Sequence, residues 1–395
     1  MALLNINAIG IGMGGGMVNL KPPTLLTSSF TVDTILGHLN WTNNAGADAQ
    51  YEVYGATNGG AETLLGTTIA GSTSYQDLTC KQNASVVYRV RVKKGSKFSD
   101  YVSSTALSTP LCWKTDQSVL TAFVINTLNV SVGKTVTVNY SDGTSQAYVG
   151  SNSNITKNFA TTGQYNVWLS GDTKHIVGFI SHWQTRTYGD IGNWILPSLI
   201  TASFDISQTG LSGNVTNWIL PSGLFQLHLY QTGLSGNVTN WILPSGLGYI
   251  YLYQTGLIGN ITNWILPSSL STFQCNSTQL TGSIPNIGFN ETTGMAFQLQ
   301  TASISDSNTT VFRKAMSVLN ISNQNVVFPT ANINKLLKAL ADWYQVNAPT
   351  ANCTINMSGA NMGIPTGGSS NVDLTRLVGY YTAVSKSCTV LVRTS

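Results

Sequence analysis

The chain has 395 residues, a length typical of two or three domains. Apolar residues make up 42% of it, enough to build hydrophobic cores, so the sparse charge does not indicate disorder. Only 9% of the residues are Asp, Glu, Lys or Arg, and the net charge of +4 is spread thinly. This excludes nucleic acid as a partner, because phosphate binding requires clustered Lys and Arg.

Residues 1–21 are expected to form an N-terminal anchoring arm. The stretch is apolar, but it has no basic region and no small-residue cleavage site, so we predict no signal peptide. Asparagines and glycines interrupt it, which excludes a membrane span of about 20 apolar residues. Its Gly10-x-Gly12-x-x-Gly15 formally matches a dinucleotide-binding motif, but Pro22 follows where a helix would have to continue. We therefore expect no nucleotide cofactor and an arm that docks on another protein.

Residues 22–110 show short alternating runs separated by Gly, Asn and Ser turns, as is typical of a β-sandwich. The predicted strands include Leu39–Trp41, Tyr51–Tyr54 and Tyr88–Val92. With the early Trp41, and with Leu78 ahead of the Tyr88 strand, the segment resembles a fibronectin type III domain. The resemblance implies an Ig-like sandwich.

The same segment holds the basic cluster of the chain. Its members are Arg89, Arg91, Lys93, Lys94 and Lys97. Alternation with valines predicts that the first three lie on one exposed face of a strand. We expect a solvated face whose charges protect a sheet edge. A docking patch for an acidic partner is the alternative.

Residues 111–186 form a second β-rich block. It contains Thr135–Thr144, with a Ser-Asp-Gly turn, and then Ala160–Trp168, with a Gly-x-Tyr-x-Val strand. These two patterns resemble the polycystic-kidney-disease-type sandwich, although Ser141 stands where that family has the first glycine of its turn. The resemblance implies a second Ig-like β-sandwich.

Internal repeats dominate the remainder. The segment Gly210–Thr232 returns almost unchanged as Gly233–Thr255 and more loosely from Gly256. A fixed period in the low twenties is typical of a solenoid, in which each turn buries its apolar face against its neighbours. We therefore predict a solenoid over residues 187–395.

Within one repeat the spacing Leu224-x-x-Leu227-x-Leu229-x-x-Thr232-x-Leu234-x-Gly236 resembles the leucine-rich repeat, and Leu280–Pro285 resembles its plant-type form. The sequence departs from that family where the family places a buried asparagine ladder. At that position it has Thr209, Thr232, Thr255 and Thr278. A threonine hydroxyl bonds neighbouring backbone with less reach, so we expect the architecture to be kept.

The frame predicts pairs of inward-facing residues on eight short parallel strands. These pairs are Phe204/Ile206, Leu227/Leu229, Ile250/Leu252, Phe273/Cys275, Phe297/Leu299, Leu319/Ile321, Ile355/Met357 and Val390/Val392. Helical spacing at Ile333–Tyr344 and Leu374–Val384 predicts helices in the last repeats only. The expected fold is thus mainly β: two Ig-like sandwiches followed by a leucine-rich-repeat solenoid.

The five cysteines contain no CxxC pair, so we predict neither a zinc site nor a disulfide framework. In the repeat frame, Cys353 and Cys388 each precede an inward pair by two residues. We therefore predict that they lie side by side on adjacent parallel strands, as free thiols.

Outward positions of the same strands predict a ligand-binding concave face. Its members are His228, Tyr230, Tyr249, Tyr251, Tyr253, Gln274, Asn276 and Gln298. Flat rings that stack on apolar faces and amides that bond hydroxyls are suited to a neutral glycan. The alternatives are a protein-contact surface, or tyrosines present only for their β-propensity.

Catalysis requires converging titratable groups, and no charged residue occurs between Asp205 and Glu291. A glycosidase needs two carboxylates roughly 5–10 Å apart, and these two are separated by more than three repeats. We therefore predict that the chain is not an enzyme and has no catalytic residues, cofactor or metal.

The order of arm, sandwiches and repeat domain resembles virion surface proteins of tailed phages that infect Bacteroidetes-like hosts, such as tail-fibre, capsid-decoration or receptor-binding proteins. The resemblance implies a homo-oligomer assembled in the host cytoplasm and working outside it. Its partners would be other virion proteins, bound through the arm, and host-surface polysaccharide or a receptor. The alternatives are an exported bacterial adhesin and a solenoid glycan hydrolase.

Overall fold

The computed structural model describes residues 20–31, 36–118, 122–183 and 186–283. Beyond these it describes 295–298, 303–305, 316–320, positions between 334 and 345, 353–357, 365, 371–385 and 388–392. The chain divides into two compact units. The first holds the described residues 20–31, 36–78 and 85–107, and the second holds 79–84 and everything from 108 onward.

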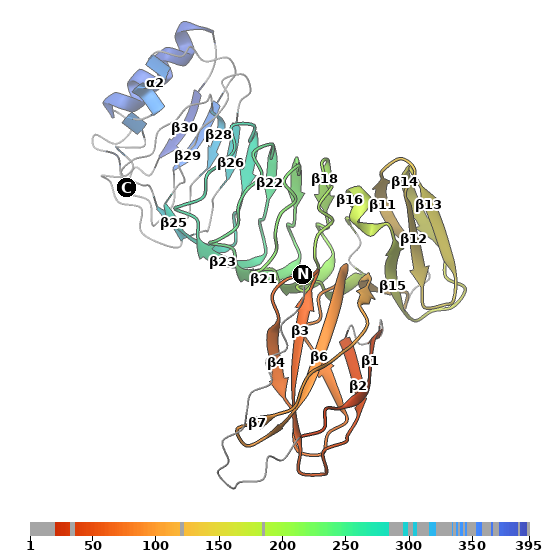
Figure 1. Cartoon of the computed structure of the whole chain (residues 1–395). Coiled ribbons are helices and arrows are strands. Elements are labelled where there is room, and N and C mark those ends of the chain that lie inside the picture. Colours follow the sequence, from red (N-terminus) through yellow and green to blue (C-terminus); the bar gives the residue numbers. More distant parts are fainter. Residues whose placement is uncertain are drawn as a thin grey trace, which may run out of the picture. The chain divides into compact units, whose positions relative to one another are not determined.

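The first unit contains two antiparallel sheets (Figure 1). One sheet orders β1 (Thr24–Thr31), β2 (Leu36–Thr42) and β5 (Ser74–Asp77). The other is built on β4 (Thr63–Thr67), β3 (Gln50–Thr57), β6 (Ala84–Lys94) and β7 (Lys97–Phe98), with β8 (Val102–Ser103) and β9 (Leu107–Thr109) also paired to β6. Because alternate residues of a strand face opposite sides, every second side chain of β6 is buried.

The core of this unit lies around Trp41 and Tyr51, whose ring centroids are 5.1 Å apart. Tyr88 is fully buried and its hydroxyl donates to Asp77 over 3.0 Å. Leu78, which contributed to the fibronectin-type resemblance, is instead 69% exposed. The two sheets are sandwich-like, as predicted.

The second unit is built on two long sheets. The ten-stranded sheet orders β13 (Ser145–Val149), β12 (Thr135–Tyr140), β15 (Gln164–Gly171), β10 (Leu111–Asp116), β17 (Thr187–Asp190), β19 (Gly210–Asn214), β21 (Gly233–Asn237), β23 (Gly256–Asn260), β25 (Gln279–Ser283) and β27 (Ser303–Ser305).

The eleven-stranded sheet orders β14 (Asn152–Lys157), β11 (Phe123–Val130), β16 (Ile176–Ile180), β18 (Ser203–Asp205), β20 (Gln226–His228), β22 (Tyr249–Tyr251), β24 (Thr272–Gln274), β26 (Met295–Gln298), β28 (Met316–Asn320), β29 (Cys353–Met357) and β30 (Cys388–Val392). A short 3-10 helix, Thr173–His175, precedes β16.

Both sheets run from the block of residues 111–180 into the repeats without a break. Pairing is antiparallel between β11 and β16 and between β10 and β17, and it is parallel from β16 and β17 onward. One hydrophobic core continues through both parts, and Trp113 contacts Trp194 of the first turn with centroids 5.7 Å apart. The boundary predicted at residues 186 and 187 thus falls just before β17, where the sheets are continuous.

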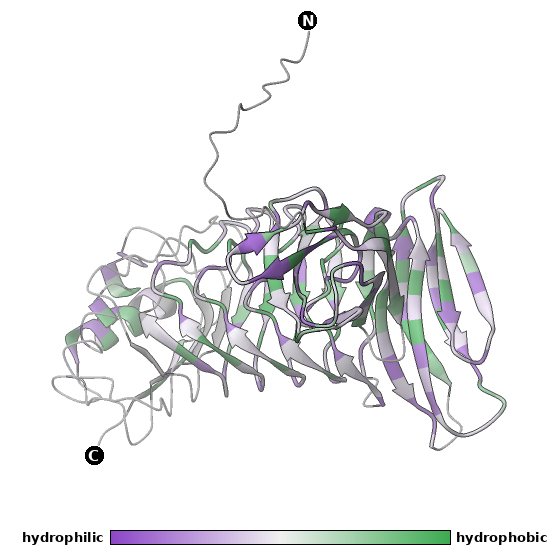
Figure 2. Ribbon diagram, turned by 60° about the horizontal axis from the view of Figure 1, so that its bottom comes forward, coloured by the Kyte–Doolittle hydropathy of each residue, from purple (hydrophilic) through white to green (hydrophobic). Residues whose placement is uncertain are grey.

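The prediction of a mainly β fold with a solenoid is confirmed. The solenoid has about four turns, seen in Figure 1 as a row of short strands from β18 onward. The predicted inward pairs from Phe204/Ile206 to Phe273/Cys275 are all buried. Figure 2 shows hydrophobic and hydrophilic segments within the solenoid turns. Each turn also contributes a strand to the ten-stranded sheet. These strands were not predicted, because sequences such as Gly-Leu-Ser-Gly-Asn show little alternation of apolar and polar residues.

Hydroxyl and amide side chains close each turn. The hydroxyl of Thr232 donates to Leu229 O over 2.7 Å, and the threonines at the same position in neighbouring turns form equivalent bonds. Gly236 has a φ of 117°, and a Cβ there would overlap Asn214 Oδ1 and lie 2.8 Å from Thr216 Oγ1. Only glycine fits such a position, so the Gly-Asn-x-Thr motif is explained by packing.

The C-terminal part agrees with the repeat frame where it is described. Helix α2 spans Val372–Ala383, and the described residues between 334 and 345 are helical. Cys353 and Cys388 are directly paired partners on β29 and β30 and form no disulfide, so the prediction that they lie side by side is confirmed. Side chains of the predicted pairs Phe297/Leu299 and Leu319/Ile321, and of Met357 and Val392, lie outside the described residues.

Candidate functional site

The predicted tyrosines lie on the outer face of the eleven-stranded sheet. Asp205, His228, Tyr251 and Gln274 are in register on β18, β20, β22 and β24, because each strand pairs in parallel with the next. A second column follows two residues later, with Ser207, Tyr230, Tyr253 and Asn276, and its backbone continues the ladder. Inward neighbours are buried, so both columns face outward.

The rings of the two columns contact one another. Tyr230 and Tyr253 are stacked, with centroids 4.5 Å apart and planes 13° apart. The ring of Tyr251, in the first column, lies 4.6 Å from the His228 ring in an edge-on arrangement and 6.2 Å from the ring of Tyr230 in the second column. Burial, followed by the neighbouring Tyr230, raises the pKa of Tyr253 to about 12, so its hydroxyl stays protonated at neutral pH.

Asp205 is the buried charge at one end of this surface. One carboxylate oxygen accepts from Ser207 N at 3.0 Å and from its hydroxyl at 2.6 Å. The other lies 3.1 Å from His182 Nδ1 and 3.2 Å from His228 Nδ1. Burial alone would raise the pKa of Asp205, but the hydrogen bonds from His228 and Ser207 outweigh it, and the pKa is lowered. The carboxylate is therefore ionised and holds the imidazole of His228 in one orientation.

Two aromatic residues beside this surface were missed by the sequence analysis. His182 and Trp183 precede the first recognisable repeat. Trp183 N nevertheless donates to Ser207 O, and Gln208 N donates to Tyr230 O in the same way in the following turn. His182 and Trp183 therefore extend the outer face by one strand beyond β18. Their rings are stacked at 4.3 Å, and Trp183 is 66% exposed. They could have been found only by extending the repeat spacing back by one turn to β16, because β16 carries no repeat motif of its own.

The remaining predicted residues extend the same face. Tyr249 is in register with Gln226 and packs edge-on against Phe225, with centroids 5.5 Å apart. Gln298 pairs with Gln274 in the backbone ladder of β26, but its side chain lies outside the description. At the turn that follows, Gln231 Nε2 donates to Gln254 Oε1 over 2.6 Å, so exposed amides border the rings.

The basic cluster of the first unit is largely neutralised by acids. Arg91 and Lys93 pair with the buried Glu52 at 2.7 and 3.1 Å. Arg89 lies 2.9 Å from Glu62, and Lys94 lies 2.7 Å from Asp48. Such pairing leaves little free charge for an acidic partner, but Arg91 and Lys93 are only partly exposed, unlike the fully solvated face that was predicted.

Within the described part of the chain, no group of three or more His, Cys, Asp or Glu side chains is placed to hold a metal ion. The Nδ1 atoms of His182 and His228 lie within hydrogen-bond distance of the same oxygen of Asp205. None of the helices among the described residues has the length and apolar character needed to cross a bilayer. Residues 1–19, which include the glycine motif of the arm, lie outside the description.

No protein-family model and no curated protein matches the chain. Solved structures similar to it include pectate lyase Pel3 from Pectobacterium carotovorum, crystallised with one and with two monomers in the asymmetric unit, at 11% and 10% identity. Another is pectate lyase PelI from Erwinia chrysanthemi in complex with tetragalacturonic acid, at 12% identity. The matches cover 76% of this chain and 84–85% of theirs, with TM-scores of 0.17–0.18.

The prediction that the chain is not an enzyme is corrected by this comparison. The structures that it resembles are lyases, so the class of enzymes is not excluded. TM-scores this low carry no information about a reaction or a ligand.

Proposed function

We propose that the outer face of the eleven-stranded sheet binds neutral glycan. The observation that carries this proposal is the contiguous set of rings formed by Tyr230, Tyr251 and Tyr253 beside the His228 imidazole. Sugar rings present flat C–H faces that pack on aromatic rings, and a rigid parallel sheet holds such rings at fixed spacing. An ordered platform loses little conformational entropy on binding.

The polar groups around the rings fit the same ligand. Gln231, Gln254 and Gln274 offer amides that both donate and accept, which suits sugar hydroxyls. The repeats carry no charged residue between Asp205 and Glu291, so an anionic polysaccharide has no cationic partner on these turns. A neutral glycan is therefore favoured over an acidic one.

At the level of the whole protein, we propose an adhesion protein of a tailed-phage virion, as a fibre, decoration or receptor-binding component. It would be anchored through residues 1–21, assembled as a homo-oligomer in the host cytoplasm, and would present the solenoid to host-surface glycan or a receptor. We further propose that the solenoid is related to leucine-rich repeats and that the preceding sheets are Ig-like sandwiches of fibronectin and polycystic-kidney-disease type. An exported bacterial adhesin is the alternative.

Binding to a microarray of neutral oligosaccharides, followed by calorimetry on the best ligand, tests the glycan proposal. Replacing Tyr230, Tyr251 and Tyr253 together by Ala should reduce affinity by more than a hundredfold, since each lost stacking contact costs about 1 kcal/mol. The matched control replaces the same three residues by Phe, which keeps the rings and should retain most of the affinity. Equal binding by the Ala variant and the wild type would refute the proposal.

A glycan-cleaving enzyme is the second candidate, and the contact between Asp205 and His228 favours it. A buried ionised carboxylate that orients an imidazole is a common arrangement for general acid–base catalysis. Nε2 of His228 has no hydrogen-bond partner among the described residues, but the atom is buried, so the side chains around it would have to move before a ligand could exchange a proton with it. Release of new chain ends from a bound polysaccharide, abolished by His228→Gln while binding persists, would support this candidate. Binding without any cleavage would leave adhesion as the function.

A further inference from the structure

A row of exposed isoleucines runs along a third side of the solenoid. This side is formed by the Trp-Ile-Leu segment that follows each strand of the ten-stranded sheet. Ile219, Ile242 and Ile265 occupy the same position in three successive turns and are 86%, 86% and 84% exposed. Large apolar side chains exposed in a row, rather than singly, mark an interaction surface.

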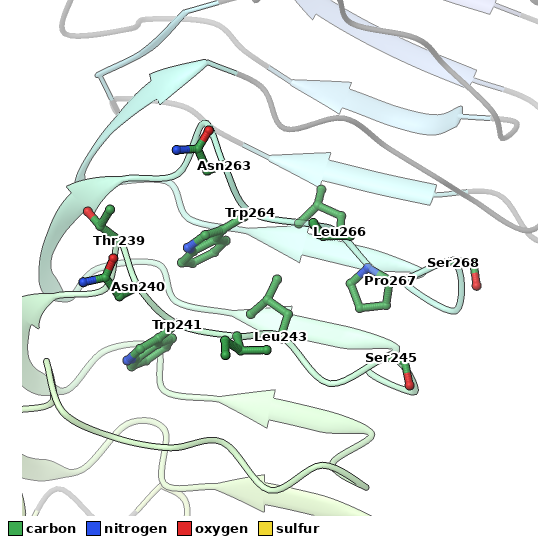
Figure 3. A pocket seen from close by; sticks show the side chains of 12 residues that line it. Thr239, Asn240, Trp241, Leu243, Ser245, Asn263, Trp264, Leu266, Pro267 and Ser268 are labelled. Atoms are coloured by element: carbon green, nitrogen blue, oxygen red, sulfur yellow. The ribbon is translucent and has the colours of Figure 1, made fainter.

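A groove of about 590 Å³ lies between the last two of these turns. Its lining consists of Thr239, Asn240, Trp241, Ile242, Leu243, Ser245, Asn263, Trp264, Ile265, Leu266, Pro267 and Ser268. Figure 3 shows Trp241 and Trp264 one above the other, with the asparagines at one end of the groove and the two serines at the other. No lining residue is charged, so the groove suits an uncharged apolar segment.

The first turn already has an extended segment at this position. Gln82 forms a parallel bridge with Trp194, its N–H donates to Asn193 O over 3.0 Å, and its carbonyl accepts from Ile195 N at 3.0 Å. Asn83 Nδ2 also donates to Ile195 O over 2.9 Å. Ile195 is consequently half-buried, in contrast to its counterparts in the following turns.

The following turns keep the same backbone groups open. Among the residues that the structure describes, the amide N–H groups of Ile219, Ile242 and Ile265 have no hydrogen-bond partner, whereas that of Ile195 is bonded. An extended segment can therefore add to these turns by the same backbone bonds that hold residues 79–84 on the first turn.

We propose that the isoleucine row and its groove bind residues 8–14 of the N-terminal arm of a second copy of this chain. In this stretch Ile9, Ile11 and Met13 alternate with glycines. In an extended conformation all three apolar side chains lie on one face, and the glycines allow close approach of the backbone. Like the groove, this stretch contains no charged residue. A contact between two different surfaces joins copies head to tail.

Analytical ultracentrifugation of the full chain tests this proposal through two variants that break opposite halves of the contact. One variant is Ile242→Asp with Ile265→Asp, which keeps the arm and charges the groove. The other is Ile9→Asp with Ile11→Asp, which keeps the groove. We expect the wild type to self-associate, each variant alone to be monomeric, and an equimolar mixture of the two to form a heterodimer. Each variant should weaken association by about tenfold or more per buried isoleucine removed.

Val132→Asp is the matched control, since Val132 is 92% exposed and lies in the connection between β11 and β12, outside the turns that carry the isoleucine row. It should associate like the wild type. A monomeric wild type, or self-association that both variants retain, would overturn the proposal, as would a mixture that stays monomeric. None of these outcomes depends on glycan binding, because the isoleucine row and the tyrosine face are on different sides of each turn.

Discussion

The first unit and the solenoid are stabilised by two different kinds of contact. In the first unit, Glu52 is buried and receives hydrogen bonds from Arg91, whose guanidinium lies 4.0 Å from the centre of the Phe98 ring. In the solenoid the same small hydroxyl and amide contacts recur every turn, with Thr232 and Asn214 as examples. Long-range ion pairs stabilise a single arrangement of strands, whereas repeated local contacts stabilise any number of identical turns.

This difference predicts different sensitivities. Beyond the first turn, which holds the buried Asp205, a solenoid held by repeated close contacts should be disrupted by one extra methyl group in a position without space, and hardly at all by salt or acid. A unit that depends on buried carboxylates should respond to both. Three substitutions test the contrast, and hydrogen exchange followed by mass spectrometry reports each unit separately, because a chain with two units need not unfold in one step.

The largest effect is expected for Gly236→Ala in the solenoid. Its positive φ and its contact with Asn214 and Thr216 leave no room for a Cβ, so we expect a loss of roughly 3 kcal/mol in the free energy of opening of the neighbouring turns. Gly246→Ala is the matched control, since no atom lies within 4 Å of a Cβ placed there. Equal exchange protection in both variants would contradict the packing explanation.

An intermediate effect is expected for Glu52→Gln in the first unit. Burial alone would raise the pKa of Glu52, but bonds from Arg91, Tyr54 and Lys93 lower it below its ordinary value of 4.5. The ionised carboxylate therefore stabilises the fold above that pH, and the stabilisation is lost as the pH falls through the lowered pKa. We expect the variant to lose about 1–2 kcal/mol at neutral pH, since both cations are partly exposed.

The acid limb of the unfolding curve checks this assignment. The difference between wild type and Glu52→Gln should shrink below pH 4.5, and added salt should reduce it at neutral pH. Exchange in the solenoid should be unchanged by the substitution. A difference that stays constant with pH would mean that the carboxylate contributes through packing only.

The smallest effect is expected for Thr232→Val, which removes the hydroxyl that donates to Leu229 O and keeps the shape of the side chain. The carbonyl loses one bond, so we expect about 1 kcal/mol of local destabilisation, independent of salt. Thr232→Ser, which keeps the hydroxyl, should behave nearly like the wild type. If Ser and Val are equally destabilising, the methyl group and not the hydrogen bond stabilises this position.

The same contrast explains what could be predicted from the sequence. Pairs such as Leu227/Leu229 could be predicted because a repeat shows its frame several times, and the columns with Tyr230 and Tyr251 follow from that frame by alternation. The contact of Arg91 with Glu52 joins residues far apart in the chain, and nothing in the local pattern points from one to the other. His182 and Trp183 were missed because the first rung is supplied by β16, where the repeat motif is absent. The second sheet was missed because its glycine-rich strands lack the period of an ordinary strand.

The unbroken pairing of neighbouring turns has a consequence for how such a chain changes over generations. Gly210–Thr232 and Gly233–Thr255 are nearly the same sequence, and each contacts its neighbours through the same register. Recombination between the two copies removes or adds one complete turn and leaves every remaining strand pair as it was. The length of the tyrosine face, and with it the number of sugar units it would span under the proposed function, can thus be altered by a single genetic event without a new fold.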